Sequence, residues 1–452
     1  MLKYVFYLIL GSICLSCVKN PDYLEEAFRL AGNNRQEMEK VLRHYRKNSE
    51  DSLKYRAAVF LIENMPGHYS YKSQDYLQSY YNEISEALSL DYDNTKNKQI
   101  IEAISAKYNN DFRIMGTALD IQTLSSEYII DNIERSFDVW EHGEWATHVS
   151  FDDFCEYILP YKGSELQATD DWRIYSKDML KGDIDLLHLC DHYKNLTFQA
   201  ATSVSQEIIN INRQEYPLGG INSIPIKDIR TIAKMPFGSC DDYTFLAIPI
   251  MRSKGIPVME DFTPQWPFQS QSHSWNIILN NYGKNLVFSA GTSNPGEPHK
   301  PDEKMAKVFR RCYAINREIA NINKLEGSVP ATFKNVFIRD VTDEYMITDD
   351  VEIEIPAIYK NKYKYAYLAV FDNKNWIPSI LLTVTGGIIQ PTIVTVTLQN
   401  CIFMSKGTNS RFMVKSSAHR AHTIITLFGQ KKLFSTGIRS LFLMPLCQAG
   451  PG

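Results

Sequence analysis

Two segments of this chain carry residue types that suit a cysteine nucleophile. The first segment, residues 237–243, reads FGSCDDY, and its glycine predicts a turn after which Cys240 opens a helix that continues to Lys254. A cysteine at a helix N-terminus faces the positive end of the helix dipole, which favours the thiolate form. Asp241 and Asp242 suit the first turn of a helix, but their negative charge opposes formation of the thiolate.

The second segment, residues 272–279, reads SHSWNIIL and predicts a strand that carries His273 at its start. An NNYG turn and a second strand over 285–290 follow it. A histidine at the start of such a hairpin can reach a thiol at the start of a helix. It would deprotonate Cys240 and later protonate the leaving amine. Either residue alone is more often structural, and it is the pair that points to chemistry on an amide bond.

Together, the runs G-S-C-D-D-Y, M-R-S-K-G-I-P-V and H-S-W-N resemble the core of the transglutaminase-like superfamily. In that superfamily the cysteine begins a helix that ends in R-x-x-G-I-P, and H-A-W opens a strand. The resemblance implies a papain-like core that transfers acyl groups through a cysteine thioester, without metal or cofactor. It implies Cys240 as the nucleophile, His273 as the base, and a peptide or protein amide as the substrate, in either cross-linking or hydrolysis.

The superfamily usually places an aspartate on the second strand to orient the imidazole, and residues 286–292 (LVFSAGT) contain no carboxylate. The residues that remain to take this role are Ser289, Thr292, Asp261, Asn276 and Asn294, among which the sequence does not choose. The backbone N–H of Cys240 is the one clear oxyanion donor. The alternative hypothesis is therefore a degenerate, non-catalytic core that binds a peptide or a glycan.

Two other clusters are weaker candidates for a site. His188 and His192 have the i, i+4 spacing of helical zinc ligands, but the glutamate of H-E-x-x-H is missing, so an amphipathic helix fits equally well. Glu141, His142, Glu144 and His148 lie beside two tryptophans and suit an exposed loop. The chain has neither a P-loop nor a G-x-G-x-x-G motif. We therefore predict no metal and no nucleotide cofactor.

The helices and strands expected along the chain indicate an α+β fold in three parts, which must position these residues. Residues 18–200 show apolar residues at helical spacing and predict a helical region. Residues 201–330 mix one helix with alternating strands and predict the transglutaminase-like core. Residues 331–452 predict a β-rich C-terminal module, with strands at VFIRDV, VEIEIP and YAYLAVF between 331 and 372.

The first 17 residues have the pattern of a lipoprotein signal peptide. One lysine, a short apolar run and the ending Leu15-Ser16-Cys17 resemble a bacterial lipobox, in which the cysteine is lipidated and becomes the new N-terminus. An ordinary secretory signal is the alternative. The arrangement of signal, helical region, core and strands also resembles exported Bacteroidetes lipoproteins. We therefore expect a membrane tether through Cys17 in the cell envelope, on the periplasmic side or the cell surface.

The overall composition is that of a globular protein, with 44% hydrophobic and 22% charged residues. A formal net charge of −4 and a pI near 6.2 argue against a nucleic-acid partner. The charge is unevenly distributed, because residues 373–452 contain eight Lys or Arg and no Asp or Glu. Two explanations fit this tail. It is either a basic surface that meets anionic lipid or glycan, or a segment that is not ancestral, as a reading-frame shift would produce.

The second explanation generates a prediction about residues 377–452. We expect them to be poorly ordered, with no structural role for Cys401 and Cys447. A chain that ends at residue 376 should then keep residues 201–330 folded, because a non-ancestral tail contributes nothing to that core. Hydrogen exchange of the truncated and full chains measures this. Loss of amide protection across 201–330 in the truncated chain would support a native tail instead.

Overall fold

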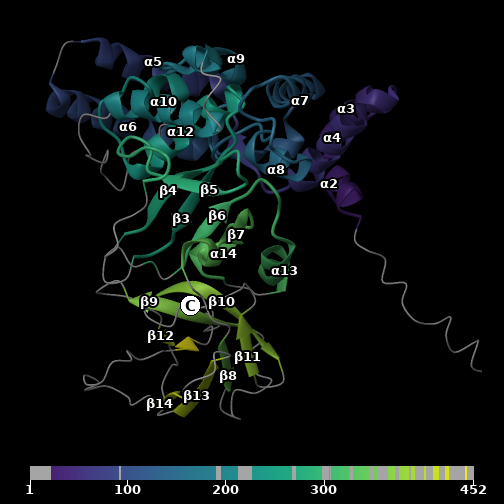
Figure 1. The fold of residues 1–452 in the computed structure, drawn as a ribbon, viewed down its shortest axis with the longest axis vertical. Helices are drawn as coiled ribbons and strands as arrows, with labels where there is room; N and C mark the ends of the chain where they lie inside the picture. The colour runs from purple at the N-terminus through teal and green to yellow at the C-terminus, as the bar shows by residue number, and fades with distance from the viewer. Residues whose placement is uncertain are drawn as a thin grey trace, which may run out of the picture.

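The computed structural model describes residues 22–90, 93–189, 195–211, 227–266, 271–297, 305, 307–325 and 329–346, together with the strands after residue 350. Helices and antiparallel sheets are both present, so the predicted α+β class is confirmed. Figure 1 shows the helices gathered above a central sheet and a second sheet below it. The tether at Cys17 lies outside the described residues.

The described part of the chain before residue 212 is mainly helical, and five of its helices have an Asp or Ser N-cap that accepts an amide N–H, as at Asp22 and Ser125. One group of helices comprises α2 (Tyr23–Ala31), α3 (Arg35–Arg46), α4 (Ser52–Asn64), α7 (Ser126–Glu141) and α8 (Phe151–Tyr157). A second group comprises α5 (Gln74–Ser89), α6 (Asn94–Met115), α9 (Trp172–Lys177), α10 (Leu196–Ile211), α11 (Ile229–Ile232) and α12 (Cys240–Ser253). The short strands β1 (Tyr69–Tyr71) and β2 (Thr117–Leu119) pair with each other among these helices.

The central sheet has five antiparallel strands in the order β5-β4-β3-β6-β7. Their bounds are β3 (Val258–Thr263), β4 (His273–Leu279), β5 (Asn285–Phe288), β6 (Phe309–Arg311) and β7 (Ile338–Asp340). The predicted hairpin after residue 272 is thus β4 and β5, which pair between Asn276 and Leu279 on one side and Asn285 and Phe288 on the other. Because β7 pairs with β6, this sheet extends past residue 330, where we placed the domain boundary.

Side-chain alternation along the strands divides the apolar interior into two cores. Trp275 and Ile277 of β4 belong to one apolar cluster with residues of α2, α3, α4 and α7, whereas Ile278 belongs to a second with residues of α5, α10 and α12. Helices therefore cover both faces of the sheet, and α12 lies between the sheet and other helices. That position explains why α12 is buried all round from Tyr243 to Ser253 rather than on one stripe.

The end of α12 is fixed by the R-S-K-G sequence. The Arg252 guanidinium is buried and donates to four backbone carbonyls, those of Tyr157, Lys162, Glu156 and Val258. Gly255 has φ +80°, and a Cβ there would lie 2.7 Å from the Val139 carbonyl oxygen, so only glycine fits. This part of the resemblance therefore has a structural role.

The C-terminal strands form a second, eight-stranded sheet in the order β12-β9-β10-β11-β8-β13-β14, with β15 on β9. They are β8 (Val351–Glu354), β9 (Tyr365–Phe371), β10 (Trp376–Thr385), β11 (Ile388–Pro391), β12 (Ile402–Phe403), β13 (Arg411–Ser416), β14 (Thr423–Thr426) and β15 (Leu443–Met444). The strands predicted at VFIRDV, VEIEIP and YAYLAVF correspond to β7, β8 and β9. Cys401, Cys447 and much of the acid-free tail lie outside the described residues, so the predictions about that tail stay predictions.

Tyr367 of β9 joins the central sheet to the C-terminal strands. It packs in a small apolar cluster with residues of β6, β7, α13 (Arg317–Leu325) and α14 (Ala331–Lys334). Its ring lies 5.6 Å from that of Phe333 on α14. The cluster gives the strand that precedes the acid-free tail a packed contact with the core.

The strongest polar link within the central sheet joins β3 to β6 and generates a prediction. Arg310 is 1% exposed and donates two hydrogen bonds of 2.8 Å to Asp261, which is 0% exposed. We expect Asp261→Ala to lower the free energy of unfolding by about 3–5 kcal/mol, because it leaves a buried guanidinium without this partner. Chemical denaturation measures the change.

A double variant, Asp261→Ala with Arg310→Met, separates the ion pair from lost packing. It should be less destabilised than Asp261→Ala alone, since it buries no unpaired charge. Additive effects of the two substitutions would contradict this account of the pair.

Candidate functional site

The start of α12 is fixed by a capping box. The Ser239 side chain accepts the Asp242 N–H, and the Asp242 carboxylate accepts the Ser239 N–H at 2.8 Å. The reciprocal pair satisfies two amide groups that a helix start otherwise leaves open. The capping box therefore holds Cys240 at the first helical position, as the sequence predicts, and engages the Asp242 carboxylate.

The Cys240 thiol is half-buried and lies against the start of β4. The backbone N–H and the hydroxyl of Ser274 both approach its sulfur. Burial raises the pKa of the thiol, the charge of Asp241 raises it further, and the Ser274 donors offset only part of this. The surroundings of Cys240 therefore raise the pKa of its thiol, the opposite of what the helix dipole alone predicts.

His273 begins β4, directly before Ser274. Its ring centroid lies 5.7 Å from that of Trp275 and 6.1 Å from that of Trp266. The side chain of Ser274 bonds to Asp241, and the Asn276 amide donates to the Thr244 carbonyl, so both of these residues face α12. Because side chains alternate along a strand, His273 shares the Trp275 side. The structure thus brings Cys240 to the start of β4, with Ser274 as the residue that contacts its thiol.

The candidates for orienting the imidazole have other roles. Asp261 accepts two hydrogen bonds from Arg310 and one from the Tyr345 hydroxyl. The Oδ1 atoms of Asn276 and Asn294 are buried without a hydrogen-bond partner in the described part of the chain. In the turn after β5, the Thr292 hydroxyl donates to the Ser289 carbonyl, and the Ser289 N–H donates to the Ser293 hydroxyl. These contacts tie Asp261, Ser289 and Thr292 to structural tasks.

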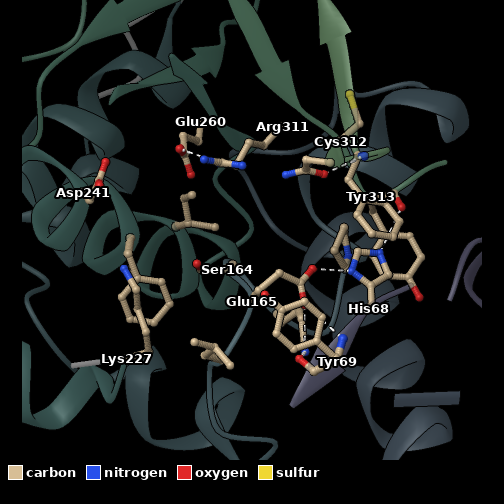
Figure 2. Close-up of a pocket in the computed structure, with 18 of the residues that line it drawn as sticks. His68, Tyr69, Ser164, Glu165, Lys227, Asp241, Glu260, Arg311, Cys312 and Tyr313 are labelled. Carbon is tan, nitrogen blue, oxygen red and sulfur yellow. Dashed lines mark hydrogen bonds and ion pairs between the residues drawn. The ribbon is translucent and has the colours of Figure 1, made fainter. Parts of the chain in front are cut away.

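A cavity of about 360 Å³ opens beside Asp241, where the N-terminal helices meet the central sheet. Figure 2 shows Asp241 and Lys227 at one end of it, His68 and Tyr313 at the other, and Glu260 with Arg311 between them. Sequence reasoning missed this cavity because its charged residues come from segments far apart in the chain. No local spacing could have identified it.

One end of the cavity is a closed polar network around His68. The two ring nitrogens lie 2.7 Å from Glu165 Oε1 and 3.1 Å from the Tyr313 carbonyl oxygen, so both contacts are made when both nitrogens carry protons. The ring stacks on Phe337 with 3.8 Å between centroids. Burial by itself would raise the pKa of Glu165, but His68 and Lys162 lower it to about 2.

From Arg311 to the Lys227 end, the charged groups of the cavity are less completely paired. The Arg311 Nε donates to Glu260 Oε1 at 2.7 Å, and its guanidinium lies over the Phe262 ring. Lys227 Nζ lies 5.1 Å from the centroid of the Phe245 ring. This end therefore presents cationic groups to the interior of the cavity.

The other clusters show no sign of a metal site. Within the described ranges, no group of three or more His, Cys, Asp or Glu side chains could hold a metal ion. The predicted His188 and His192 pair falls on side chains outside the described residues. His148 bonds to the Leu279 carbonyl and to Asn281, which pins the loop after α7 to the hairpin. Glu141, His142 and Glu144 are exposed as predicted, but Glu141 is the last residue of α7 rather than part of a loop.

Comparisons with known proteins leave the family open. No family model, curated protein or solved structure matches the chain. None of the described helices combines the length and apolar character needed to cross a membrane. The transglutaminase-like resemblance therefore stays a prediction, based on the residues quoted for it.

The pKa of Glu165 generates a prediction about acid stability. Its folded-state pKa of about 2 is below the ordinary value near 4.3, so the carboxylate stabilises the fold above about pH 4.5. We expect this contribution, on the order of 3 kcal/mol, to disappear as pH falls from about 4.5 to about 2. Urea unfolding across this pH range measures it.

Glu165→Gln should be less stable at pH 7, and its stability should depend less on pH between 5 and 2. Glu86→Gln is the matched control, because Glu86 is exposed. Equal pH dependence in Glu165→Gln and the parent protein would contradict the assigned pKa.

Proposed function

We propose that this chain binds a peptide-like ligand in the cavity beside Cys240, as a non-catalytic core of transglutaminase-like type. The papain-like arrangement of this core and the separate β-rich C-terminal module belong to the same proposal. The observation that carries it is a cavity whose walls present charged groups of both signs, beside a cysteine whose thiol pKa is raised by burial and by Asp241. Such walls suit the alternating donors and acceptors of a peptide more than an apolar ligand.

Two features of the candidate site, one of the thiol and one of the imidazole, support binding without catalysis. A thiol that reacts at neutral pH needs a pKa near or below that pH, and here burial and Asp241 act in the other direction. A catalytic imidazole also needs a partner that fixes its orientation, and the Asp261 carboxylate is held by Arg310 and Tyr345.

Cysteine acyl transfer or amide hydrolysis is the second candidate. It is favoured by the position of Cys240 at a capped helix start, against the N–H and hydroxyl of the residue that follows His273. In that reaction Sγ would attack the amide carbon, and water or a second amine would take the acyl group. His273 would have to leave the Trp275 side of β4 to carry the thiol proton to the leaving amine.

We further propose that lipid on Cys17 tethers the protein to a bacterial membrane in the cell envelope, on the periplasmic side or the cell surface. The lipobox-like Leu15-Ser16-Cys17 supports this. A tethered binding protein needs no cofactor. Its partners would be a peptide, with a glycan as the alternative ligand, and the membrane reached through the anchor.

The two candidate functions differ in the reactivity of Cys240. For the binding function, alkylation of Cys240 by iodoacetamide should accelerate only above pH 8.5, the ordinary titration range of a thiol. Asp241→Asn should move this profile to lower pH, because it removes a nearby negative charge. Asp183→Asn, on an exposed loop, is the matched control. Mass spectrometry of the Cys240 peptide measures the rate.

Binding and turnover complete this test. A pool of N-acetylated dipeptides should raise the melting temperature of the parent and Cys240→Ala proteins equally, with no release of amine. A low thiol pKa, together with dansylcadaverine incorporation or amide hydrolysis that Cys240→Ala abolishes, would establish acyl transfer instead.

The tether generates a separate prediction. Cys17→Ala should abolish lipidation, and the protein should then be released in soluble form or accumulate unprocessed. Fractionation of bacterial membranes with metabolic labelling by a palmitate analogue measures both outcomes. Cys14→Ala is the matched control and should leave labelling unchanged. Unchanged membrane association of Cys17→Ala would contradict the lipobox assignment.

A further inference from the structure

Arg311 uses only some of its hydrogen-bond donors in contacts with the described residues. Its Nε donates to Glu260, whereas its two terminal amino groups make no hydrogen bond within the described residues. The side chain is 42% exposed, and it lines the cavity. The guanidinium lies 4.5 Å from the centroid of the Phe262 ring, which holds its plane. A planar, pre-oriented guanidinium with two free amino groups suits a bidentate oxyanion.

Most other cationic side chains that line the cavity already have ion-pair or hydrogen-bond partners. Lys162 pairs with Asp120 and donates to the Tyr69 carbonyl, and Arg252 donates to four carbonyls. Lys227 differs, since its ammonium lies over the Phe245 ring and makes no ion pair with a described residue. Arg311 and Lys227 are therefore the two cationic groups of the lining that can receive a ligand.

The anions of the cavity limit which ligand fits. Glu165 is held by His68 and the Tyr69 N–H, and Glu260 is held by Arg311. Asp241 accepts one hydrogen bond from Ser274 and lies at the Lys227 end of the cavity (Figure 2). Because Glu165 and Glu260 already have partners, Asp241 is the carboxylate that most opposes an anion, and it repels a phosphate dianion more than a singly charged carboxylate. An acceptor at Asp241 suits an amide N–H of the same ligand.

We propose that Arg311 binds a carboxylate of the ligand through its two terminal amino groups, and that Lys227 adds positive potential at the same site. The ligand is then a peptide with a free C-terminal carboxylate or an acidic sugar. The inference rests on the proposed binding function only in taking a peptide as the carrier of that carboxylate.

The test compares one probe with and without its charge. N-acetyl-glycyl-alanine, its C-terminal amide, sodium glucuronate and inorganic phosphate are each titrated to 10 mM against the full chain by calorimetry and thermal shift. We expect the peptide acid to bind at least tenfold more tightly than its amide, and phosphate not to bind. Arg311→Lys should weaken acid binding about tenfold, because a lysine cannot donate in bidentate geometry.

Matched variants separate recognition from folding. Arg339→Lys, an exposed arginine on β7 outside the cavity lining, should change nothing. Lys227→Gln should weaken acid binding severalfold, and the exposed Lys234→Gln should not. Glu260→Gln should tighten acid binding, because it removes a carboxylate that competes for Arg311, whereas a purely structural Arg311 predicts no gain.

The outcomes distinguish the two proposals. Equal binding of acid and amide would overturn the carboxylate site and leave the peptide-binding function intact. Binding of glucuronate alone would support the carboxylate site and contradict the peptide function. Tighter binding of phosphate than of the acid, no binding of any probe at 10 mM, or an Arg311→Lys protein that binds the acid normally would overturn the carboxylate site.

Discussion

The arrangement of the site depends on one buried guanidinium. Arg252, near the end of α12, donates to carbonyls of the segment around Tyr157 and Lys162 and of β3, and Tyr157 is 95 residues away in the sequence. Burial lowers the pKa of Arg252 to about 10, so the group stays charged at neutral pH. Four carbonyl oxygens replace the water that burial removes. Because the end of α12 is tied in this way, the position of its start against β4 is also determined.

A second constraint is the two-sided burial of the central sheet. Trp275 and Ile277 of β4 belong to one core and Ile278 to the other, so a change of register by one residue would exchange them. Ser274 and Asn276 are polar residues on the α12 side, and they bond to Asp241 and to the helix backbone. His273 and Trp275 lie on the other side. The same alternation that builds the core therefore decides which side chain meets the thiol.

The cavity has a different physical origin. It lies where the helical segments meet the sheet, and the polar groups on its walls must be paired because water is partly excluded there. The His68 end achieves this with a closed network that also stabilises the fold. The Arg311 guanidinium, by contrast, uses its Nε for Glu260 and leaves its terminal amino groups open to solvent.

The sequence alone determined the local features of this protein. The helix predicted from Cys240 to Lys254 is observed from Cys240 to Ser253, and the predicted strand over 272–279 is observed from His273 to Leu279. Caps, turns and hydrophobic periodicity are set by neighbours within a few residues, so they can be read directly. Three features came only from the tertiary structure. They are the rise in the pKa of the Cys240 thiol, the role of Asp261 and the cavity lined by His68 and Arg311. Each depends on burial or on partners from distant segments, and the order of residues does not encode those distances.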